Sequence, residues 1–323
     1  MPLDGQRSRA GRPIGRRRLL KTALGGLAGA SLPALGLTAC SRAAAGDFPV
    51  TELGERLMLV SGVPGNVVVL STSDGRVVVD TGAPEHADAL AAQIRALPGR
   101  GRMRAVFNTH YHLDQTGGNA VVAGDGAPII AHAITRQWLA TDTYAPFEDR
   151  WVSARPEAAW PTETFYETGA IDTDGERVEY GYLLQAHTAG DIYVFFRNAN
   201  VLAVGDAVSP ERDPALDWFA GGWLGARVEA MQKLLALADE ETRIVPAYGP
   251  VMTRADLAAE TEMMTALWER LNTLIRQGRS AEDMLAAGVL DETGREWSDP
   301  QAFLYDASKG LWAHQISLAA DIL

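Results

Sequence analysis

The sequence is poor in cysteine and has no long, purely apolar run. Cys40 is its only cysteine, so no intramolecular disulfide can stabilise the fold. The most apolar stretch, residues 22–37, is shorter and richer in glycine than a membrane-spanning helix, which needs about 20 apolar residues. No internal repeat is visible. We therefore expect a fold that depends on an ordinary hydrophobic core, without a transmembrane helix.

Positive charge is also scarce. The chain has 29 lysine and arginine residues against 41 aspartate and glutamate residues, which gives a formal net charge of −12. Residues 1–39 hold seven of the basic residues and one acidic residue, so the chain beyond them has a net charge of −18. Surfaces that bind nucleic acid or anionic lipid are basic. We therefore expect a small-molecule substrate as the partner and no nucleic acid.

The first 39 residues have the pattern of an export signal. Arginines precede the apolar stretch, and Arg16-Arg17-Arg18-Leu19-Leu20-Lys21 resembles the bacterial twin-arginine signal, with an ordinary basic secretory signal as the alternative. Leu37-Thr38-Ala39-Cys40 then resembles a lipobox, in which Cys40 becomes the lipidated first residue of the mature chain. We predict a signal peptide over residues 1–39 and a lipidated tether over residues 40–49. The mature chain is then anchored on the periplasmic side of a bacterial membrane.

Two histidines and one aspartate stand at alternating positions, as His110, His112 and Asp114. They follow the apolar run 104–108, which is typical of a buried strand. In an extended segment, side chains two positions apart point the same way, so these three are expected to converge on one point. Imidazole and carboxylate are ligands that zinc prefers. The spacing therefore predicts a metal site just after this strand.

Three later segments place further polar residues beside short apolar runs. His187 lies in Ala186-His187-Thr188-Ala189-Gly190-Asp191, Asp206 ends the run 201–204, and Tyr248 follows Ile244-Val245. Together with Val77-Val78-Val79-Asp80-Thr81-Gly82 near the start, this order of segments resembles the metallo-β-lactamase superfamily of metal hydrolases. The resemblance covers roughly residues 53–274.

The resemblance implies an α/β fold of four layers, the αβ/βα sandwich. We expect this metallo-β-lactamase-like domain over residues 50–252. Residues 253–323 show helical spacing, and we expect extra C-terminal helices there that pack on the same domain.

The resemblance also implies a set of metal ligands. His110, His112 and His187 would hold the first metal ion, with Asp206 bridging towards a second. The family's second position uses Asp114 and two further histidines, but this sequence has Gln115 and Tyr248 at those two places. We therefore expect a degenerate second position and one zinc ion, with iron or manganese as the alternative metals.

Such a site suits hydrolysis, because zinc polarises a carbonyl or phosphoryl oxygen and lowers the pKa of water towards about 7. The implied reaction is cleavage of an ester, thioester, lactone, amide or similar bond. Asp114 is the candidate catalytic acid/base, and the Asp114→Asn change is expected to shift the pH optimum. Gln115 and Tyr248 have two interpretations: hydrogen-bonding replacements in a working site, or signs of a non-catalytic metal- or ligand-binding lipoprotein. An iron or manganese oxidoreductase is a third hypothesis.

Aromatic residues concentrate in residues 138–166, a segment whose structure the sequence does not define. It is either a flap over the metal cleft or a set of rings that pack helices onto the sheet. Trp218, Phe219 and Trp223 are expected to line the cleft. Asp80 and Asp191 are expected to hold the loops that carry the metal ligands.

Overall fold

A computed structural model describes residues 48–99, 102–124, 126–145 and 149–320. The predicted signal peptide, Cys40 and the predicted tether as far as residue 47 lie outside the described residues. All described residues belong to one unit, residues 43–323. No helix among them is both long enough and apolar enough to span a bilayer.

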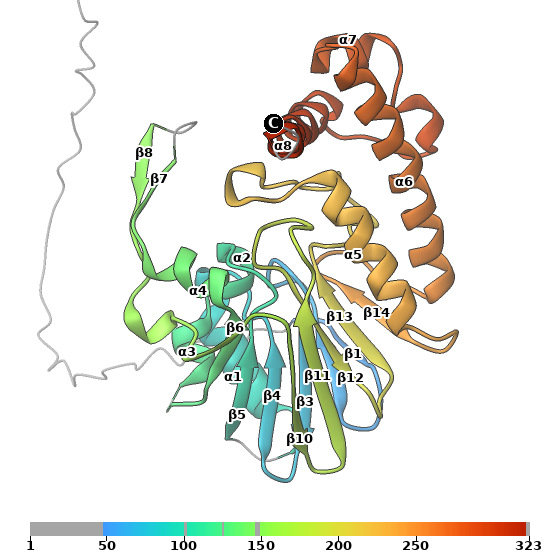
Figure 1. Ribbon diagram of the computed structural model, residues 1–323. Helices are drawn as coiled ribbons and strands as arrows, with labels where there is room; N and C mark the ends of the chain where they lie inside the picture. Colours follow the sequence, from blue (N-terminus) through green and yellow to red (C-terminus); the bar gives the residue numbers. More distant parts are fainter. Residues whose placement is uncertain (1–47, 100–101, 125, 146–148, 321–323) are drawn as a thin grey trace, which may run out of the picture. The chain divides into compact units, whose positions relative to one another are not determined.

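Two mixed β-sheets form the centre of this unit (Figure 1). The first sheet has the order β1-β2-β3-β4-β5-β6-β9, and the second has the order β10-β11-β12-β13-β14. The strands of the first sheet are β1 (Val50–Glu52), β2 (Leu57–Val60), β3 (Val67–Thr72), β4 (Gly75–Val79), β5 (Met103–Phe107), β6 (Ile129–His132) and β9 (Glu163–Phe165). Those of the second are β10 (Thr168–Thr173), β11 (Glu176–Tyr182), β12 (Ile192–Phe196), β13 (Val201–Gly205) and β14 (Arg243–Pro246). A separate hairpin pairs β7 (Thr143–Ala145) with β8 (Arg150–Val152).

Helices cover the outer face of each sheet. The α-helices are α1 (Ala87–Ala96), α2 (Leu113–Thr116), α3 (Asn119–Ala123), α4 (Ala133–Ala140), α5 (Leu224–Leu237), α6 (Arg254–Arg276), α7 (Ala281–Ala286) and α8 (Pro300–Ala320). Short 3₁₀ helices are η1 (Pro84–His86), η2 (Glu157–Ala159), η3 (Trp218–Ala220) and η4 (Asp291–Thr293).

The alternation of side chains along the strands builds four layers. In β3, Val68 and Leu70 pack between the two sheets, whereas Val67 and Val69 pack against α1 and α3. In β12, the even-numbered side chains likewise enter the space between the sheets. Its odd-numbered side chains, Tyr193 and Phe195, pack against α5 and α6. The predicted αβ/βα sandwich is confirmed.

The connections bring several strand ends to one edge of the sandwich. The parallel pairs β4–β5 and β13–β14 place the residues that follow each of these strands at that edge. The antiparallel pairing of β12 with β13 brings the start of β12 there as well. The Ile192 N–H donates to the Thr109 carbonyl at 2.9 Å, which joins the two sheets at this edge. Polar residues far apart in the sequence therefore lie close together.

The strand predicted over residues 104–108 is found as β5, one residue earlier at each end. Helices are found in the segment 253–323 where they were expected, and the first of them, α6, begins after a reciprocal capping box between Thr253 and Asp256. Helices α6, α7 and α8 bury apolar side chains in the same core as β12 and β13. Phe48, within the predicted tether, already exchanges two hydrogen bonds with Gln93 of α1.

Candidate metal centre

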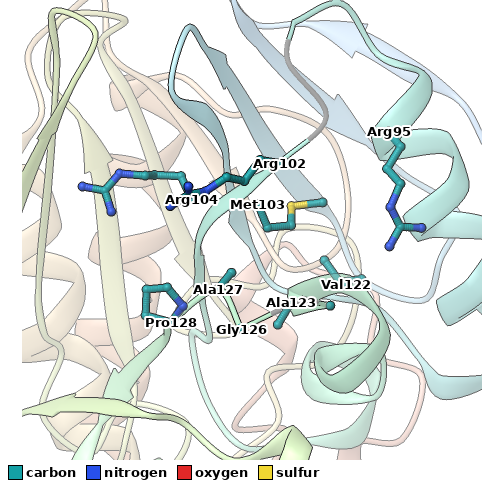
Figure 2. Close-up of a pocket in the computed structure, with 10 residues that line it drawn as sticks. Arg95, Arg102, Met103, Arg104, Val122, Ala123, Gly126, Ala127 and Pro128 are labelled. Atoms are coloured by element: carbon teal, nitrogen blue, oxygen red, sulfur yellow. The ribbon is translucent and has the colours of Figure 1, made fainter.

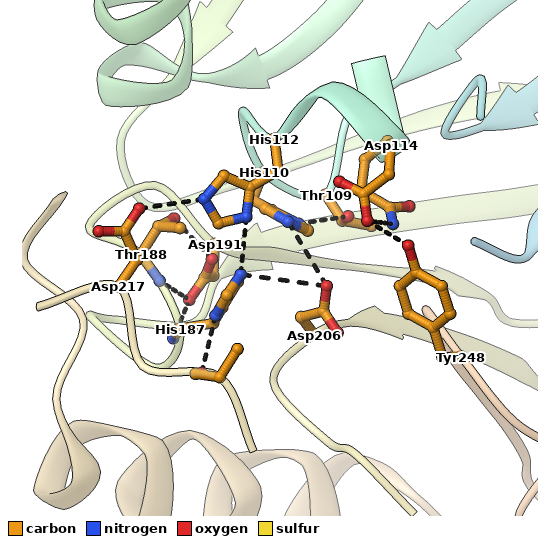
Figure 3. A network of polar contacts seen from close by, with 12 residues as sticks. Thr109, His110, His112, Asp114, His187, Thr188, Asp191, Asp206, Asp217 and Tyr248 are labelled. Atoms are coloured by element: carbon orange, nitrogen blue, oxygen red, sulfur yellow. Dashed lines mark hydrogen bonds and ion pairs between the residues drawn. The ribbon is translucent and has the colours of Figure 1, made fainter. Parts of the chain in front are cut away.

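Three histidine side chains meet at this edge. His110 follows β5, His112 precedes α2, and His187 lies in the loop between β11 and β12. One ring nitrogen of each lies within 4.8 Å of the other two. Figure 3 shows the three rings turned towards a common space. The structure thus brings His110 and His112 together and adds His187, which lies 75 residues further along the chain.

The local path of the chain differs from the expected one. The expectation of one extended segment through Asp114 is wrong, because β5 ends at Phe107 and His112 is already the N-cap of α2. Asp114 lies in the first turn of that helix. Among the described residues it is not part of the group that could hold one metal ion together with the three histidines.

The hydrogen bonds of each ring leave one nitrogen bare. The Nδ1 atom of His110 lies 3.1 Å from the Thr109 hydroxyl, which lies 2.8 Å from Asp80, and Nδ1 of His187 lies 2.8 Å from the Ala215 carbonyl. The Nε2 atom of His112 lies 3.0 Å from the Asp217 carboxylate. We assign a proton to each of these nitrogens. The Ala215 carbonyl and the Asp217 carboxylate can only accept hydrogen bonds, and the Thr109 hydroxyl, which donates its own hydrogen to Asp80, accepts from His110.

The bare nitrogens are then Nε2 of His110, Nδ1 of His112 and Nε2 of His187. The first is buried and has no hydrogen-bond partner among the described residues. The other two lie 2.9 Å apart, within hydrogen-bonding distance of each other. A metal cation among the three nitrogens, or a proton between the last two, would satisfy these lone pairs, and neutral imidazoles oriented by a second hydrogen bond are the usual ligands of zinc. The donor set therefore fits a metal ion.

Burial keeps two of these rings neutral. It lowers the pKa of His110 and of His187 well below the usual range, and the neighbouring histidines lower both further. Burial also lowers the pKa of His112, but the hydrogen bond to Asp217 and the nearby carboxylates outweigh burial and raise it. A raised pKa favours protonation of this ring, and Asp217 holds the proton on Nε2, so a metal ion at Nδ1 would displace the proton from that nitrogen only.

Asp206 faces the same space from the end of β13. Its Oδ2 atom lies 3.6 Å from Nε2 of His110 and 4.0 Å from Nε2 of His187. Its other oxygen accepts a hydrogen bond from Arg212 at 2.6 Å. Buried Arg227 donates to the Asp206 carbonyl at 2.7 Å and so holds the main chain at this point. The carboxylate is therefore fixed beside two of the three histidines.

The residues at the degenerate second metal position also lie in contact with one another. The Tyr248 hydroxyl donates to Asp114, and the Gln115 amide donates to the same carboxylate oxygen at 3.3 Å. Burial and the hydrogen bond to Asp114 raise the pKa of Tyr248, so the phenol stays protonated. The guanidinium of Arg212 lies over the Tyr248 ring, 3.4 Å from its centre. The Arg212 guanidinium therefore lies next to Asp206, and the Tyr248 phenol lies next to Asp114.

Two buried aspartates hold the loops that carry the histidines, in agreement with expectation. Asp80, whose backbone has a left-handed φ of 63°, accepts both the N–H and the hydroxyl hydrogen of Thr109. Asp191 accepts the N–H groups of His187 and Thr188 and the Thr188 hydroxyl hydrogen. Burial raises the pKa of Asp191 to about 7, although these hydrogen bonds oppose the shift.

Asp217 is a site residue that sequence reasoning missed. It accepts hydrogen bonds from His112, from the Tyr111 hydroxyl and from the Ala220 N–H. Burial alone would raise the pKa of its carboxyl, but the hydrogen bonds from His112 and Tyr111 outweigh burial and lower it to about 2. Its position 105 residues after His112, in no recognisable motif, gave no signal in the sequence.

A cavity of about 450 Å³, which we call the His112 cavity, opens beside this cluster. Its lining comes from the histidine loop, α4, the β7–β8 hairpin with the residues after it, and η3. These residues are Tyr111, His112, Leu113, Trp138, Leu139, Thr141, Thr143, Arg150, Val152, Ser153, Arg155, Asp217 and Phe219.

The segment 138–166 divides between a cavity wall and the core. Trp138 and the hairpin line the His112 cavity, whereas Phe165 packs between the two sheets. Of the other rings expected at the cleft, Phe219 lines the cavity and Trp223 packs against the core beneath α5. Phe147 lies outside the described residues.

A second hollow, of about 410 Å³, lies at the opposite end of β5 (Figure 2). Arg102, Met103 and Arg104 line it at the start of this strand, and Arg95 reaches it from α1. The histidine loop follows the other end of β5. This hollow is therefore remote from the metal centre.

Comparison with known sequences agrees with this geometry. The sequence pattern of the metallo-beta-lactamase superfamily matches residues 60–248, more than half of the chain. The chain belongs to the metallo-β-lactamase superfamily. The matched range contains His110, His112, His187 and Asp206, so the chain carries the three-histidine metal site of metallo-β-lactamase-fold hydrolases.

Individual relatives are distant. The chain is 25% identical over 209 residues to the 2,4-dinitroanisole O-demethylase subunit alpha of Nocardioides sp. (strain JS1661). The match covers 63% of this chain and 54% of that protein, so the chain spans about half the length of this curated relative.

Two solved structures show the shared metallo-β-lactamase fold. A metallo-beta-lactamase from Pontibacter korlensis is 21% identical with a TM-score of 0.55, covering 68% of this chain and 99% of that one. The stereoselective inverting sec-alkylsulfatase Pisa1 from Pseudomonas sp. is 16% identical with a TM-score of 0.62, covering 83% of this chain and 50% of that one. At these identities the likeness extends to the fold alone.

Proposed function

We propose that this chain is a zinc-dependent hydrolase that uses one metal ion to cleave an ester, thioester, lactone, amide or similar bond. The observation that carries the proposal is the set of three bare nitrogens on His110, His112 and His187. A zinc ion held there would polarise the bond to be cleaved and supply a nucleophile from water at neutral pH.

The protein's own groups have distinct tasks in this proposal. Asp206, held by Arg212 and Arg227, presents one oxygen to the metal space. Asp114 accepts hydrogen bonds from Tyr248 and Gln115 and so has a fixed orientation. We propose that Asp114 takes the proton that leaves the attacking water and returns it to the leaving group as the scissile bond breaks.

The proposal is tested by removing and restoring the metal. Zinc-loaded protein is expected to hold one ion per chain and to hydrolyse at least one member of an ester, thioester, lactone and cephalosporin panel. An aryl methyl ether joins the panel because the curated relative is named for O-demethylation of 2,4-dinitroanisole. Chelation should abolish the activity and added zinc should restore it. Hydrolysis that survives complete metal removal would contradict the proposal.

A single ion is expected because the second position lacks imidazoles and holds the Arg212 charge. The double change Gln115→His and Tyr248→His should therefore create a second ligand set around Asp114. We expect elemental analysis to find one zinc per chain in the native protein and a second, weaker one in the double variant. Adding Arg212→Ala should tighten the second ion, because it removes a competing cation. Two ions in the native protein would refute the single-metal assignment.

A non-catalytic metal- or ligand-binding protein is the alternative. This alternative is supported by the Asp114 carboxylate, which already accepts hydrogen bonds from Tyr248 and Gln115. Zinc binding at His110, His112 and His187 without turnover of any panel member would favour this alternative. Iron or manganese in place of zinc would favour redox chemistry, and elemental analysis distinguishes the metals.

Export and lipid anchoring belong to the same proposal. Their support is the sequence alone, namely the arginine-rich start, the apolar stretch and the lipobox-like segment that ends at Cys40. An anchored, periplasmic hydrolase would meet small-molecule substrates that arrive from outside the cell.

A further inference from the structure

The His112 cavity combines an aromatic wall with positive charge. Tyr111 stacks on Trp138, with ring centres 4.9 Å apart and planes 18° apart. Phe219 meets Trp138 at 5.9 Å and is 42% exposed. These rings offer a flat apolar surface next to a metal-site histidine, and a cavity of about 450 Å³ lies within the usual size range of small-molecule sites.

Arg155 contributes the charge. Its main chain is fixed on both sides, because its N–H donates to the Leu139 carbonyl at 2.8 Å and its carbonyl accepts from the Trp160 indole at 2.8 Å. Its guanidinium makes no hydrogen bond or ion pair with the residues that the structure describes. Arg150 of β8 lines the same cavity.

The other polar groups of the cavity do not neutralise Arg155. The Asp217 carboxylate is already occupied by His112, Tyr111 and Ala220. The protein as a whole is acidic, so an anion would be repelled by most of its surface. The Arg155 guanidinium, which pairs with no described residue, is therefore a specific local attraction for a negatively charged group beside the metal centre.

We propose that the His112 cavity selects substrates with a flat apolar body and a single carboxylate. The body lies against Trp138 and Phe219, the carboxylate pairs with Arg155, and the scissile bond reaches the histidine cluster. This inference rests on the proposed function and names its substrate class. Arg150 and Arg155 bring positive charge to the cavity from a part of the chain that is distant in sequence from His187 and Asp206.

A pair of substrates that differ only in charge tests the proposal. We would compare 4-carboxyphenyl acetate with 4-carbamoylphenyl acetate on zinc-loaded protein. The native protein is expected to favour the carboxylate in kcat/KM by about 10- to 100-fold, the range for one charge-assisted hydrogen bond. In Arg155→Ala this preference should fall towards one, and Arg155→Lys should keep part of it.

Two controls make the result specific. Arg104→Ala removes one positive charge from the remote hollow and should leave the preference unchanged. Trp138→Ala should lower kcat/KM for both substrates, because both lose the aromatic wall. A preference that persists in Arg155→Ala, or that falls equally in Arg104→Ala, would overturn the proposal.

A binding measurement separates this inference from the proposed function. Biphenyl-4-carboxylate should bind zinc-loaded native protein in a calorimeter and bind Arg155→Ala about 10- to 100-fold more weakly. If neither ester is hydrolysed but this difference is seen, the carboxylate site stands and the hydrolase proposal fails. If the esters are hydrolysed and the carboxylate binds both proteins equally, the site assignment fails and the hydrolase proposal stands.

Discussion

The change His187→Ala is expected to remove both the metal and the activity. His187 supplies one of three imidazole nitrogens, and two remaining histidines with a carboxylate do not complete a set in which three protein ligands hold zinc firmly. Zinc affinity should fall by more than about 100-fold, beyond the range for loss of a group that only supports a ligand. Isothermal titration with zinc and hydrolysis of the best panel substrate measure the two effects.

The control for this change is another histidine. His86 contacts Phe48 near α1 and is not part of the histidine cluster. His86→Ala should therefore bind one zinc with native affinity. If His187→Ala kept native zinc affinity while remaining folded by circular dichroism, the three-histidine site would be wrong.

The change Asp217→Ala should weaken zinc binding by about 10- to 100-fold. The Asp217 carboxylate holds the proton on Nε2 of His112, which leaves Nδ1 bare for the metal. Without the carboxylate, the His112 ring can turn or take the other tautomer, so fewer molecules present three bare nitrogens at once. Zinc titration and the zinc dependence of hydrolysis report this loss.

Two milder variants distinguish the loss of the hydrogen bond that orients His112 from a general disturbance of the loop that carries Asp217. Asp217→Asn keeps a shape and an acceptor oxygen but not the charge, and Tyr111→Phe removes only the second hydrogen bond to Asp217. Zinc affinity should decrease in the order native, Tyr111→Phe, Asp217→Asn, Asp217→Ala. Equal affinities in all four proteins would show that Asp217 has no part in orienting His112.

The layered fold and the three histidines could be predicted because their signals are local. Strands of alternating or continuous apolar residues define the sheets, and His110 and His112 are two positions apart after one of these strands. The path through α2 could not be predicted, since a helix of four residues has too little periodicity to be recognised. Asp114 was therefore expected at the wrong place in the geometry.

The supporting groups could not be predicted for a different reason. Asp217 and Arg155 act only through tertiary contacts, with His112 in one case and with the His112 cavity in the other. Neither residue belongs to a motif with fixed spacing, and the strands of the β7–β8 hairpin, three residues each, are too short for a recognisable alternation. Arg212 was visible near Asp206 in the sequence, but its position over Tyr248 depends on the meeting of β13 and β14 ends.

The position of the bound zinc ion decides whether His110, His112 and His187 form the metal site. We would grow crystals of the zinc-loaded protein and measure anomalous scattering at the zinc absorption edge. We expect one zinc ion, about 2.0–2.1 Å from Nε2 of His110, Nδ1 of His112 and Nε2 of His187. Zinc that binds elsewhere, or a second ion of equal occupancy between Asp114 and Asp206, would contradict this expectation.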